Sequence, residues 1–283
     1  MKIAIYGTGA IGSTFALHLS KVGHDVTCIA RGPRLAQLRA DGAIVATDGQ
    51  RAPITPAETL DASIVFDLVI VTVLAHKVDA ILPALKASAA DTILFAFNQF
   101  DPLSRLREAI GPERVAFGFP AILASLEEGK LKAKIYTLGQ KTIANEARWA
   151  ELFTSAGIAT DVEPDMQSWL RTHAVVVVVL MSMAVTAYQR GAGLAFTEAA
   201  TYARALREGL ELVAQLGNRA TPGAMRLLRV LPLAVVASLL FVVSRTGLVK
   251  TIGVIGPDEP RALADVMLAA SSTPLPSLRA IRP

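Results

Sequence analysis

The first part of the chain alternates short apolar runs with segments of helical periodicity. Runs typical of β-strands occupy Lys2–Tyr6, Asp25–Ala30, Leu68–Val73, Thr92–Phe97 and Val115–Gly118. Between them, the spacing of apolar residues predicts helices over Ala10–Val22, Pro33–Arg39, His76–Ala87 and Pro102–Ile110. Continuous apolar strands joined through helices indicate a doubly wound α/β fold, with a parallel sheet covered by helices on both faces.

The pattern becomes shorter and more polar between Ala121 and Ala144, with turn signals at Glu128-Gly129 and Leu138-Gly139. This change predicts an antiparallel extension of the sheet. We place the domain boundary near Glu163-Pro164, because the pattern after it is almost entirely helical.

The rest of the chain predicts an all-helical domain. Its helical segments are Asp165–Gln189, Thr197–Leu216, Thr221–Val230, a stretch after Pro232, and Glu259–Ala270. We therefore expect a Rossmann-type domain over residues 1–164 and a helical domain for substrate and dimerisation over 165–270. The Pro- and Ser-rich residues 271–283 are expected to form an extended or frayed tail.

Composition bears on the cellular setting. Hydrophobic residues make up 52% of the chain and charged residues 18%. The apolar runs Ala174–Ala187 and Val230–Val243 are shorter than the roughly 20 residues that span a bilayer, which favours buried helices and no membrane partner. The consecutive valines of the first run predict a central helix, or an apolar surface for a homodimer. One cysteine, Cys28, suits a cytoplasmic protein.

The charge distribution and the few cysteines and histidines argue against nucleic-acid-binding, disulfide-stabilised and metal-binding proteins. The net charge is +4, and its basic residues are scattered rather than clustered with aromatics, so nucleic acid is not indicated. The single cysteine excludes an intrachain disulfide. The four histidines lie far apart, without the spacing of a metal site.

The strongest chemical signal is the turn Gly7-Thr8-Gly9-Ala10-Ile11-Gly12. It follows a predicted strand directly and opens a predicted helix, which is the context of a dinucleotide-binding turn. In such a turn Gly7 allows the tight bend, Gly9 lets a pyrophosphate approach the backbone, and Gly12 lets the helix pack against the strand. The N–H groups of the helix N-terminus then bind the phosphates.

The end of the second strand indicates which dinucleotide binds. A site for NAD places an acid about 20 residues after the glycines, whereas this chain has Arg31 there. An arginine can pair with a 2′-phosphate, so we expect NADP; the alternative is a solvated loop charge.

Four segments resemble the ketopantoate reductase (2-dehydropantoate 2-reductase) family. They are the glycine turn, the residues after the second strand, VTVLAHKVDAILPAL and Phe95-Ala96-Phe97-Asn98. The resemblance implies a Rossmann domain followed by a helical domain, and NADPH-dependent reduction of a 2-oxo acid, a small-molecule substrate. It places Asn98 beside the nicotinamide and substrate. The alternative for Asn98 is a turn residue at a strand end.

The chain departs from the family pattern at several positions. Leu74 replaces a lysine of the cofactor segment, and Lys77 is the nearest cation, where the family often has a polar cofactor contact. In the helical domain Arg171 falls at the position of the catalytic lysine, and Val175 and Val179 replace asparagines. The family's late serine and glutamate have no clear match.

These departures limit the expected chemistry. Arg171 can bind a carboxylate but is a poor proton donor, because a guanidinium keeps its proton at physiological pH. His173 has a pKa suited to proton transfer, although its two-residue separation from Arg171 turns it to another helix face. Alternatively, Arg171 forms a salt bridge and His173 packs within the helix. The sequence thus favours an NADPH-dependent oxidoreductase, with an NADP-binding relative that has lost catalysis as the alternative.

Overall fold

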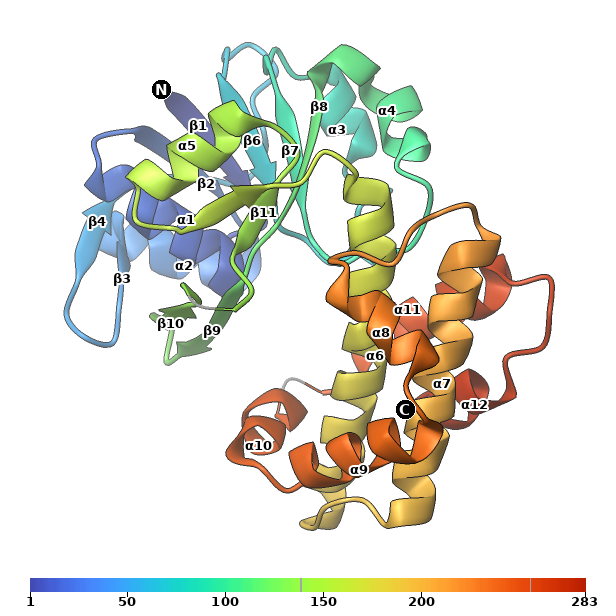
Figure 1. Ribbon diagram of the computed structural model, residues 1–283. Coiled ribbons are helices and arrows are strands. Elements are labelled where there is room, and N and C mark those ends of the chain that lie inside the picture. Colours follow the sequence, from blue (N-terminus) through green and yellow to red (C-terminus); the bar gives the residue numbers. More distant parts are fainter. Residues whose placement is uncertain (138, 255) are drawn as a thin grey trace. The chain divides into compact units, whose positions relative to one another are not determined.

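The computed structural model describes residues 1–137, 139–254 and 256–283. They form two compact units, which we describe separately (Figure 1). The first contains Met1–Phe97 and Leu103–Met166, and the second contains Asn98–Pro102 and Gln167–Pro283. The short segment Asn98–Pro102, inside the predicted α/β domain, therefore packs with the helical unit.

The first unit is built on an eight-stranded sheet of order β12-β11-β8-β7-β6-β1-β2-β5. All neighbouring strands are parallel except β8 and β11. The inner strands β6 and β7 are wholly buried, as expected of continuous apolar runs. The strands are β1 (Lys2–Tyr6), β2 (Asp25–Ile29), β5 (Thr55–Ala57), β6 (Leu68–Val71), β7 (Ile93–Ala96), β8 (Val115–Phe119), β11 (Thr142–Ala144) and β12 (Thr160–Val162).

The chain winds in two directions from β1. It runs outward through β2 to β5, and then returns to the other side of β1 and runs through β6, β7 and β8. Right-handed crossovers therefore place α1 (Ala10–Lys21) on one face and α3 (Leu82–Ala87) and α4 (Ser104–Ile110) on the other. The doubly wound fold is confirmed. The reversal of direction falls between β1 and β6, where such folds bind ligands.

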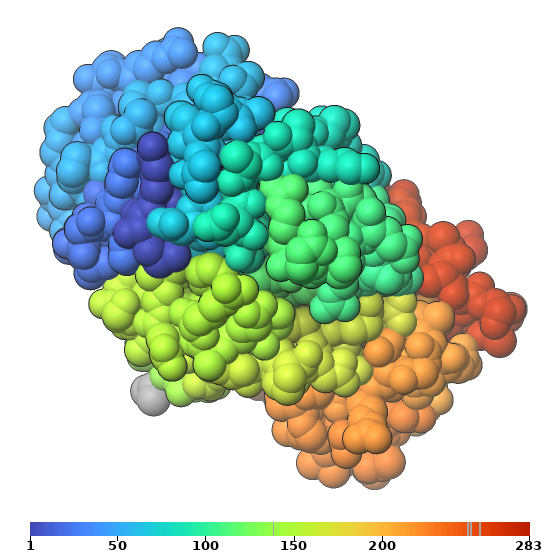
Figure 2. Space-filling view, turned by 90° about the horizontal axis from the view of Figure 1, so that it is seen from above, coloured from blue at the N-terminus to red at the C-terminus, as the bar shows by residue number. Residues whose placement is uncertain are grey.

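A second helix joins α1 on its face of the sheet. Phe153 of α5 (Ala147–Ser155) packs on Phe15 of α1, with ring centroids 5.1 Å apart. The His18 ring hydrogen-bonds the Ala156 carbonyl at 2.9 Å. Figure 2 shows this late segment of the first unit, in yellow-green, beside dark blue residues from the start of the chain.

The antiparallel extension is only partly as predicted. β11 joins the main sheet next to β8, but β9 (Ile122–Glu127) and β10 (Lys130–Ile135) form a separate hairpin. Its turn has positive φ at both Glu128 (49°) and Gly129 (79°), which matches the twist of a two-residue hairpin. The other turn signal, Leu138-Gly139, lies partly outside the described residues. A second hairpin, β3 (Ala43–Val45) with β4 (Arg51–Pro53), was not predicted.

The helix predicted over His76–Ala87 is wrong in its first half. The structure has a single 3₁₀ turn, η1 (Ala75–Lys77), and α3 begins only at Leu82. Pro83 is the reason: it has no N–H to bond back to residue 79, and its ring would clash with that carbonyl. The helix therefore restarts with Pro83 in its first turn. The open stretch leaves Leu74 and Lys77 exposed.

The second unit is all helical, as predicted. Two long helices, α6 (Met166–Arg190) and α7 (Phe196–Gln215), carry most of its core. Gly209 of α7 lies against α6, because a Cβ there would come within 2.6 Å of Val175. The remaining helices are α8 (Ala224–Val230), α9 (Leu233–Val243), α10 (Gly247–Gly253), which was not predicted, α11 (Asp258–Ala270) and α12 (Pro276–Ala280).

The valine run belongs to the core of this unit. Val175, Val178 and Val179 are at most 1% exposed, which fits a central helix rather than an apolar outer surface. By length and composition α6 could cross a membrane, but 72% of its apolar window is buried inside the protein. Buried core helices of globular domains can have the same length and apolar composition.

The expected extended tail is a helix instead. In α12 the side chain of Leu278 is fully buried, and Ile281 just beyond it is 5% exposed. The Glu208 carboxylate of α7 accepts hydrogen bonds from the backbone N–H groups of Ser277 (3.0 Å) and Leu278 (2.8 Å). It thereby caps the N-terminus of α12 from a distant part of the sequence, which the proline-rich composition did not reveal.

We expect Glu208→Ala to lower the free energy of unfolding by about 1–3 kcal/mol, because two N–H groups lose a charged acceptor. Urea denaturation measures the change. Glu211→Ala, on the same helix, is the control: Glu211 forms only a half-exposed ion pair with Arg229, worth about 0–1 kcal/mol. Equal losses in the two variants would contradict the capping role.

Candidate functional site

A cavity of about 690 Å³ lies at the carboxyl ends of β1, β2 and β6, where the winding reverses. It falls within the roughly 300–1,000 Å³ that is typical of small-molecule sites. The lining is largely apolar, with basic residues at the rim. The residues that line the cavity are Tyr6, Gly7, Thr8, Gly9, Ile29, Ala30, Arg31, Arg34, Thr72, Val73, Leu74, His76, Lys77, Ala80, Ile81 and Leu126.

The glycine turn forms one wall of this cavity. Gly7 has a φ of +98°, a conformation that side chains disfavour. At Gly12 a Cβ would lie 2.5 Å from the Gly7 carbonyl oxygen and 2.7 Å from Thr72 Oγ1, so only glycine lets α1 pack this closely. At Gly9, by contrast, no described atom lies within 4 Å of where a Cβ would stand. That free space borders the cavity.

The other residues of the turn are placed as follows. Thr8 is turned inward, because its hydroxyl (3.1 Å) and its backbone N–H (3.2 Å) both donate to the Ile29 carbonyl. Ala10 and Ile11 open the first turn of α1 and, in the described chain, are not part of the cavity lining. Among the described residues, no side chain caps this helix, so the N–H groups of its first turn are available to an anion.

Three predicted cofactor residues also line the cavity. Arg31 is exposed and immediately precedes α2 (Gly32–Asp41). Leu74 is 36% exposed, and Lys77 ends the 3₁₀ turn with its side chain in solvent. With Arg34, the cavity thus combines three cations with an apolar surface.

Arg34 joins three parts of the site. Its Nε donates to the Thr8 carbonyl (3.1 Å) and its Nη2 to Ser13 Oγ (2.7 Å). Its Nη1 donates to the carbonyl of Gly129 in the β9–β10 turn at 2.8 Å. Burial lowers the pKa of this guanidinium. Arg34 therefore fixes the glycine turn, α1 and the hairpin to one another.

Asn98, in the second unit, has a partner that the sequence did not suggest. Its Nδ2 donates to Glu259 Oε1 at 2.8 Å, from the first turn of α11. Its buried Oδ1 has no hydrogen-bond partner among the described residues. A buried carbonyl oxygen without a donor is costly, so it is a natural acceptor for a ligand hydroxyl or N–H.

Glu259 is the functional candidate that sequence reasoning missed. An acid in the first turn of a helix is common, and only the fold brings this one to Asn98 across 161 residues. The family's late serine and glutamate had no match near Ser244-Arg245. Ser244 there accepts the Leu194 N–H and donates to the Phe241 carbonyl, which is an internal role.

Arg171 is buried and binds backbone. Its Nε donates to the Phe100 carbonyl at 3.0 Å, its Nη1 donates to Asn218 Oδ1, and its guanidinium lies 5.4 Å from the centre of the Phe100 ring. Burial lowers its pKa, and nearby Asp101 partly opposes the shift. These contacts hold the segment Asn98–Pro102 against α6.

His173 stacks flat on Trp169, with ring centroids 4.8 Å apart and an angle of 10° between the planes. Burial lowers its pKa to about 4, so the ring is neutral at pH 7. As the sequence indicated from helix rotation, Arg171 and His173 have different surroundings.

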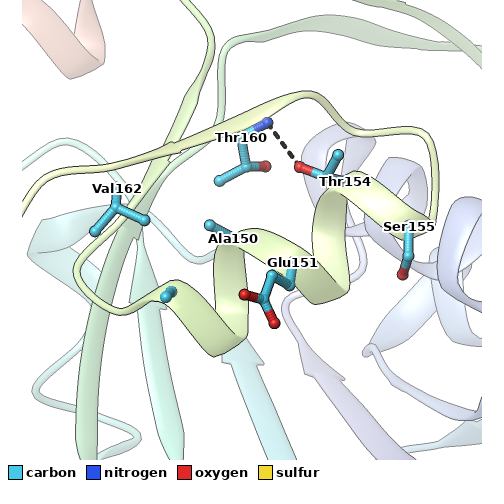
Figure 3. A pocket seen from close by; sticks show the side chains of 7 residues that line it. Ala150, Glu151, Thr154, Ser155, Thr160 and Val162 are labelled. Atoms are coloured by element: carbon cyan, nitrogen blue, oxygen red, sulfur yellow. Dashed lines mark hydrogen bonds between the residues drawn. The ribbon is translucent and has the colours of Figure 1, made fainter.

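Neither metal-ligating residues nor the second hollow adds a candidate site in the described part of the chain. No group of three potential metal ligands occurs among the described residues. A hollow of about 430 Å³ between α5 and β12 is lined by small and polar residues (Figure 3). There Thr160 N–H donates to Thr154 Oγ1 at 3.3 Å, and the lining includes no basic residue in the part of the chain described.

We expect Gly12→Ala to lower the free energy of unfolding by about 1–3 kcal/mol and to abolish dinucleotide binding, because its Cβ overlaps backbone. Gly9→Ala is the matched variant: it should melt as the wild type does but bind NADPH at least tenfold more weakly. Thermal melts and fluorescence titration measure both. Wild-type NADPH affinity in Gly9→Ala would count against a pyrophosphate at the turn.

The lowered pKa of His173 predicts that the free energy of unfolding depends on pH. Because its pKa is lower in the folded chain than in the unfolded one, its contribution to stability is full above about pH 6.5 and is lost as the pH falls toward 4. We expect His173→Phe, which keeps an aromatic ring on Trp169, to reduce the fall in unfolding free energy from pH 7 to 4 by about 1–3 kcal/mol. Parallel urea titrations at each pH test this; identical slopes would refute it.

Known proteins resemble both the sequence and the fold. A 2-dehydropantoate 2-reductase of Vibrio cholerae is 33% identical over 138 residues, which are 48% of this chain and 42% of that protein. One from Pyrococcus horikoshii is 27% identical over 177 residues, covering 60% of this chain and 58% of the relative. The chain thus matches less than two thirds of the length of these curated relatives.

A solved structure extends the likeness in fold to the whole chain. The PanE/ApbA family ketopantoate reductase from Ralstonia eutropha has a TM-score of 0.75 at 17% identity, and the match covers 100% of this chain and 96% of that one. The family model described as ketopantoate reductase PanE/ApbA matches residues 3–146, just over half of the sequence. The chain therefore belongs to the ketopantoate reductase PanE/ApbA family.

Proposed function

We propose that this protein is an NADPH-dependent oxidoreductase that reduces a 2-oxo acid, or a related carbonyl compound, to the hydroxy compound. The observation that carries the proposal is the cavity at the switch point, bordered by the open backbone of Gly9 and the uncapped start of α1. Family membership supports the same class of reaction.

The residues present fit a dinucleotide. The N-terminus of α1 would receive the pyrophosphate, and the apolar wall with Leu74 would pack against the rings. Arg34, engaged with Thr8, Ser13 and Gly129, would keep that cradle in shape. NADPH, when bound, supplies the hydride.

The choice of NADP over NAD rests on the end of β2. No acid follows this strand, whereas the exposed residues Arg31 and Lys77 both line the cavity. Cations favour a 2′-phosphate, and an acid would favour the free ribose hydroxyls. A D-mandelate dehydrogenase of similar fold (TM-score 0.72, 17% identity) was solved with NADH, so this preference is a feature to test in each member.

On the substrate side we assign contact with the reacting carbonyl compound to Asn98. Its amide is oriented by Glu259, and its Oδ1 can accept the hydroxyl of the product. The sequence assigned Arg171 and His173 to the same chemistry. We instead propose that Arg171 positions the Asn98–Pro102 segment, since its donors are bound to Phe100 and Asn218. His173, neutral above about pH 4, would pack rather than donate a proton.

The substrate class is supported by two kinds of relatives. Ketopantoate and the oxidised form of mandelate are both 2-oxo acids, and proteins named for both reactions share this fold. A homodimer is proposed on the weaker ground that a dimeric ketopantoate reductase from Staphylococcus aureus has a similar fold, with a TM-score of 0.69. A cytoplasmic location remains a prediction.

We expect the protein to oxidise NADPH when given ketopantoate or benzoylformate, measured as loss of absorbance at 340 nm. Asn98→Ala should lower kcat at least 100-fold, because it removes the group assigned to the reacting oxygen. Gln215→Ala, an exposed amide of the same unit, should leave the rate unchanged. NADPH binding without turnover of any 2-oxo acid would instead favour a family member that has lost catalysis.

We expect Arg31→Glu to weaken NADPH binding at least 30-fold more than NADH binding, since the carboxylate repels only the additional 2′-phosphate. Arg39→Glu, on the same helix but outside the cavity lining, should affect the two nucleotides equally and weakly. Fluorescence titration at fixed ionic strength measures the affinities. Equal losses in Arg31→Glu would remove the assignment.

A further inference from the structure

One stretch of the second unit has a one-sided charge composition. From Arg219 to Pro257 the sequence contains five basic residues and no aspartate or glutamate. The chain as a whole is nearly balanced, with 28 basic and 24 acidic residues, so an acid-free stretch of this length stands apart. It contains α8 and α9. Taken together, these two helices are as long and as apolar as a membrane-spanning segment.

The outer face of α9 is apolar and exposed. Val235, Leu239 and Val242 lie one turn apart along the helix and are 50%, 54% and 60% exposed. The opposite face, with Val236 and Leu240, is buried against the core. A surface helix of a globular domain normally turns charged residues outward, so both faces of α9 being apolar indicates a second apolar contact.

The same character continues on neighbouring elements. On α8, Leu227 is 55% exposed and Val230 is 76% exposed. At the C-terminal end of α9, the half-exposed Phe196 packs edge-on against Phe241, with ring centroids 6.0 Å apart. We call the exposed apolar side chains of α8 and α9 the α8–α9 face: Leu227, Val230, Val235, Leu239 and Val242.

Uncompensated cations border this face. The guanidinium of Arg245 lies 3.5 Å from the centre of the Phe241 ring and donates to the carbonyls of Phe241 and Leu194. Arg226 donates to the Ala220 carbonyl. Neither forms an ion pair with any residue that the structure describes. Carbonyl partners orient these side chains but leave their positive charge intact.

We propose that the α8–α9 face is a docking surface for a phospholipid bilayer that contains anionic lipids. Exposed aliphatic and aromatic side chains bordered by arginines are the combination that binds a helix at the membrane interface. Charge complementarity favours this occupant over a second copy of the chain, since two-fold pairing would bring the same cations together.

The contact is peripheral. With 11 residues, α9 is about 16 Å long, against about 30 Å for the hydrocarbon core of a bilayer. The axes of α8 and α9 are bent by 118°, so the two do not form one straight span. In this arrangement the two helices lie on the membrane surface and do not cross it.

Flotation of the full-length protein with vesicles tests the proposal. We expect binding to vesicles of 70% phosphatidylcholine and 30% phosphatidylglycerol, at least tenfold stronger than to pure phosphatidylcholine and weakened by 0.5 M NaCl. Leu239→Glu should reduce binding at least tenfold. Arg226→Gln should reduce it about fivefold, the loss expected for one cation at an anionic surface.

Matched variants separate docking from misfolding and from self-association. Val162→Glu, which changes an exposed valine of β12 in the first unit, should leave vesicle binding unchanged, and all variants should retain NADPH binding and melting temperature. Absence of wild-type binding to the anionic vesicles overturns the proposal. So does a dimer, seen by analytical ultracentrifugation, that Leu239→Glu dissociates, because the face would then be occupied by a second copy.

Discussion

The missing side chain at Gly12 is the constraint on which the nucleotide-binding end of this protein depends. Its Cα lies so close to the Gly7 carbonyl and the Thr72 hydroxyl that a single methyl group would overlap both. That contact joins α1 to the ends of β1 and β6, and Thr72 Oγ1 also donates to the Gly7 carbonyl at 2.7 Å. The tight turn, the direction of the first helix and the hollow beside it follow from one contact between backbone atoms.

In the helical unit, the buried guanidinium of Arg171 fixes the position of the segment Asn98–Pro102. Arg171 holds the Phe100 carbonyl, and Gln167 Nε2 donates to the Asp101 carbonyl at 3.3 Å, so α6 grips the segment that follows β7. Asn98 begins this segment and meets Glu259 of α11. Arg171 is thus part of the framework that holds this segment against α6.

Sequence patterns anticipated the architecture where local chemistry decides it. The buried strands, the glycine turn and the long helices could be predicted from the spacing of apolar residues and glycines. A strand buried on both faces is a continuous apolar run, and a helix buried on one side has apolar residues every three or four positions. Pro83 showed the limit of periodicity, since apolar spacing continued through a residue that cannot continue a helix. The helical tail escaped prediction because its cap, Glu208, lies about 70 residues away. Glu259 escaped for the same reason, as its contact with Asn98 exists only after folding.

The bonds of Arg34 have a consequence for how the site comes into being. They join Thr8, Ser13 and Gly129, so the wall of the cavity is closed by a turn that lies 95 residues after Arg34 in the sequence. A chain emerging from the ribosome has its glycine turn early but lacks the hairpin that completes the wall. The complete wall exists only once the hairpin has formed, so a ligand of this cavity would stabilise the first unit as a whole rather than its early strands.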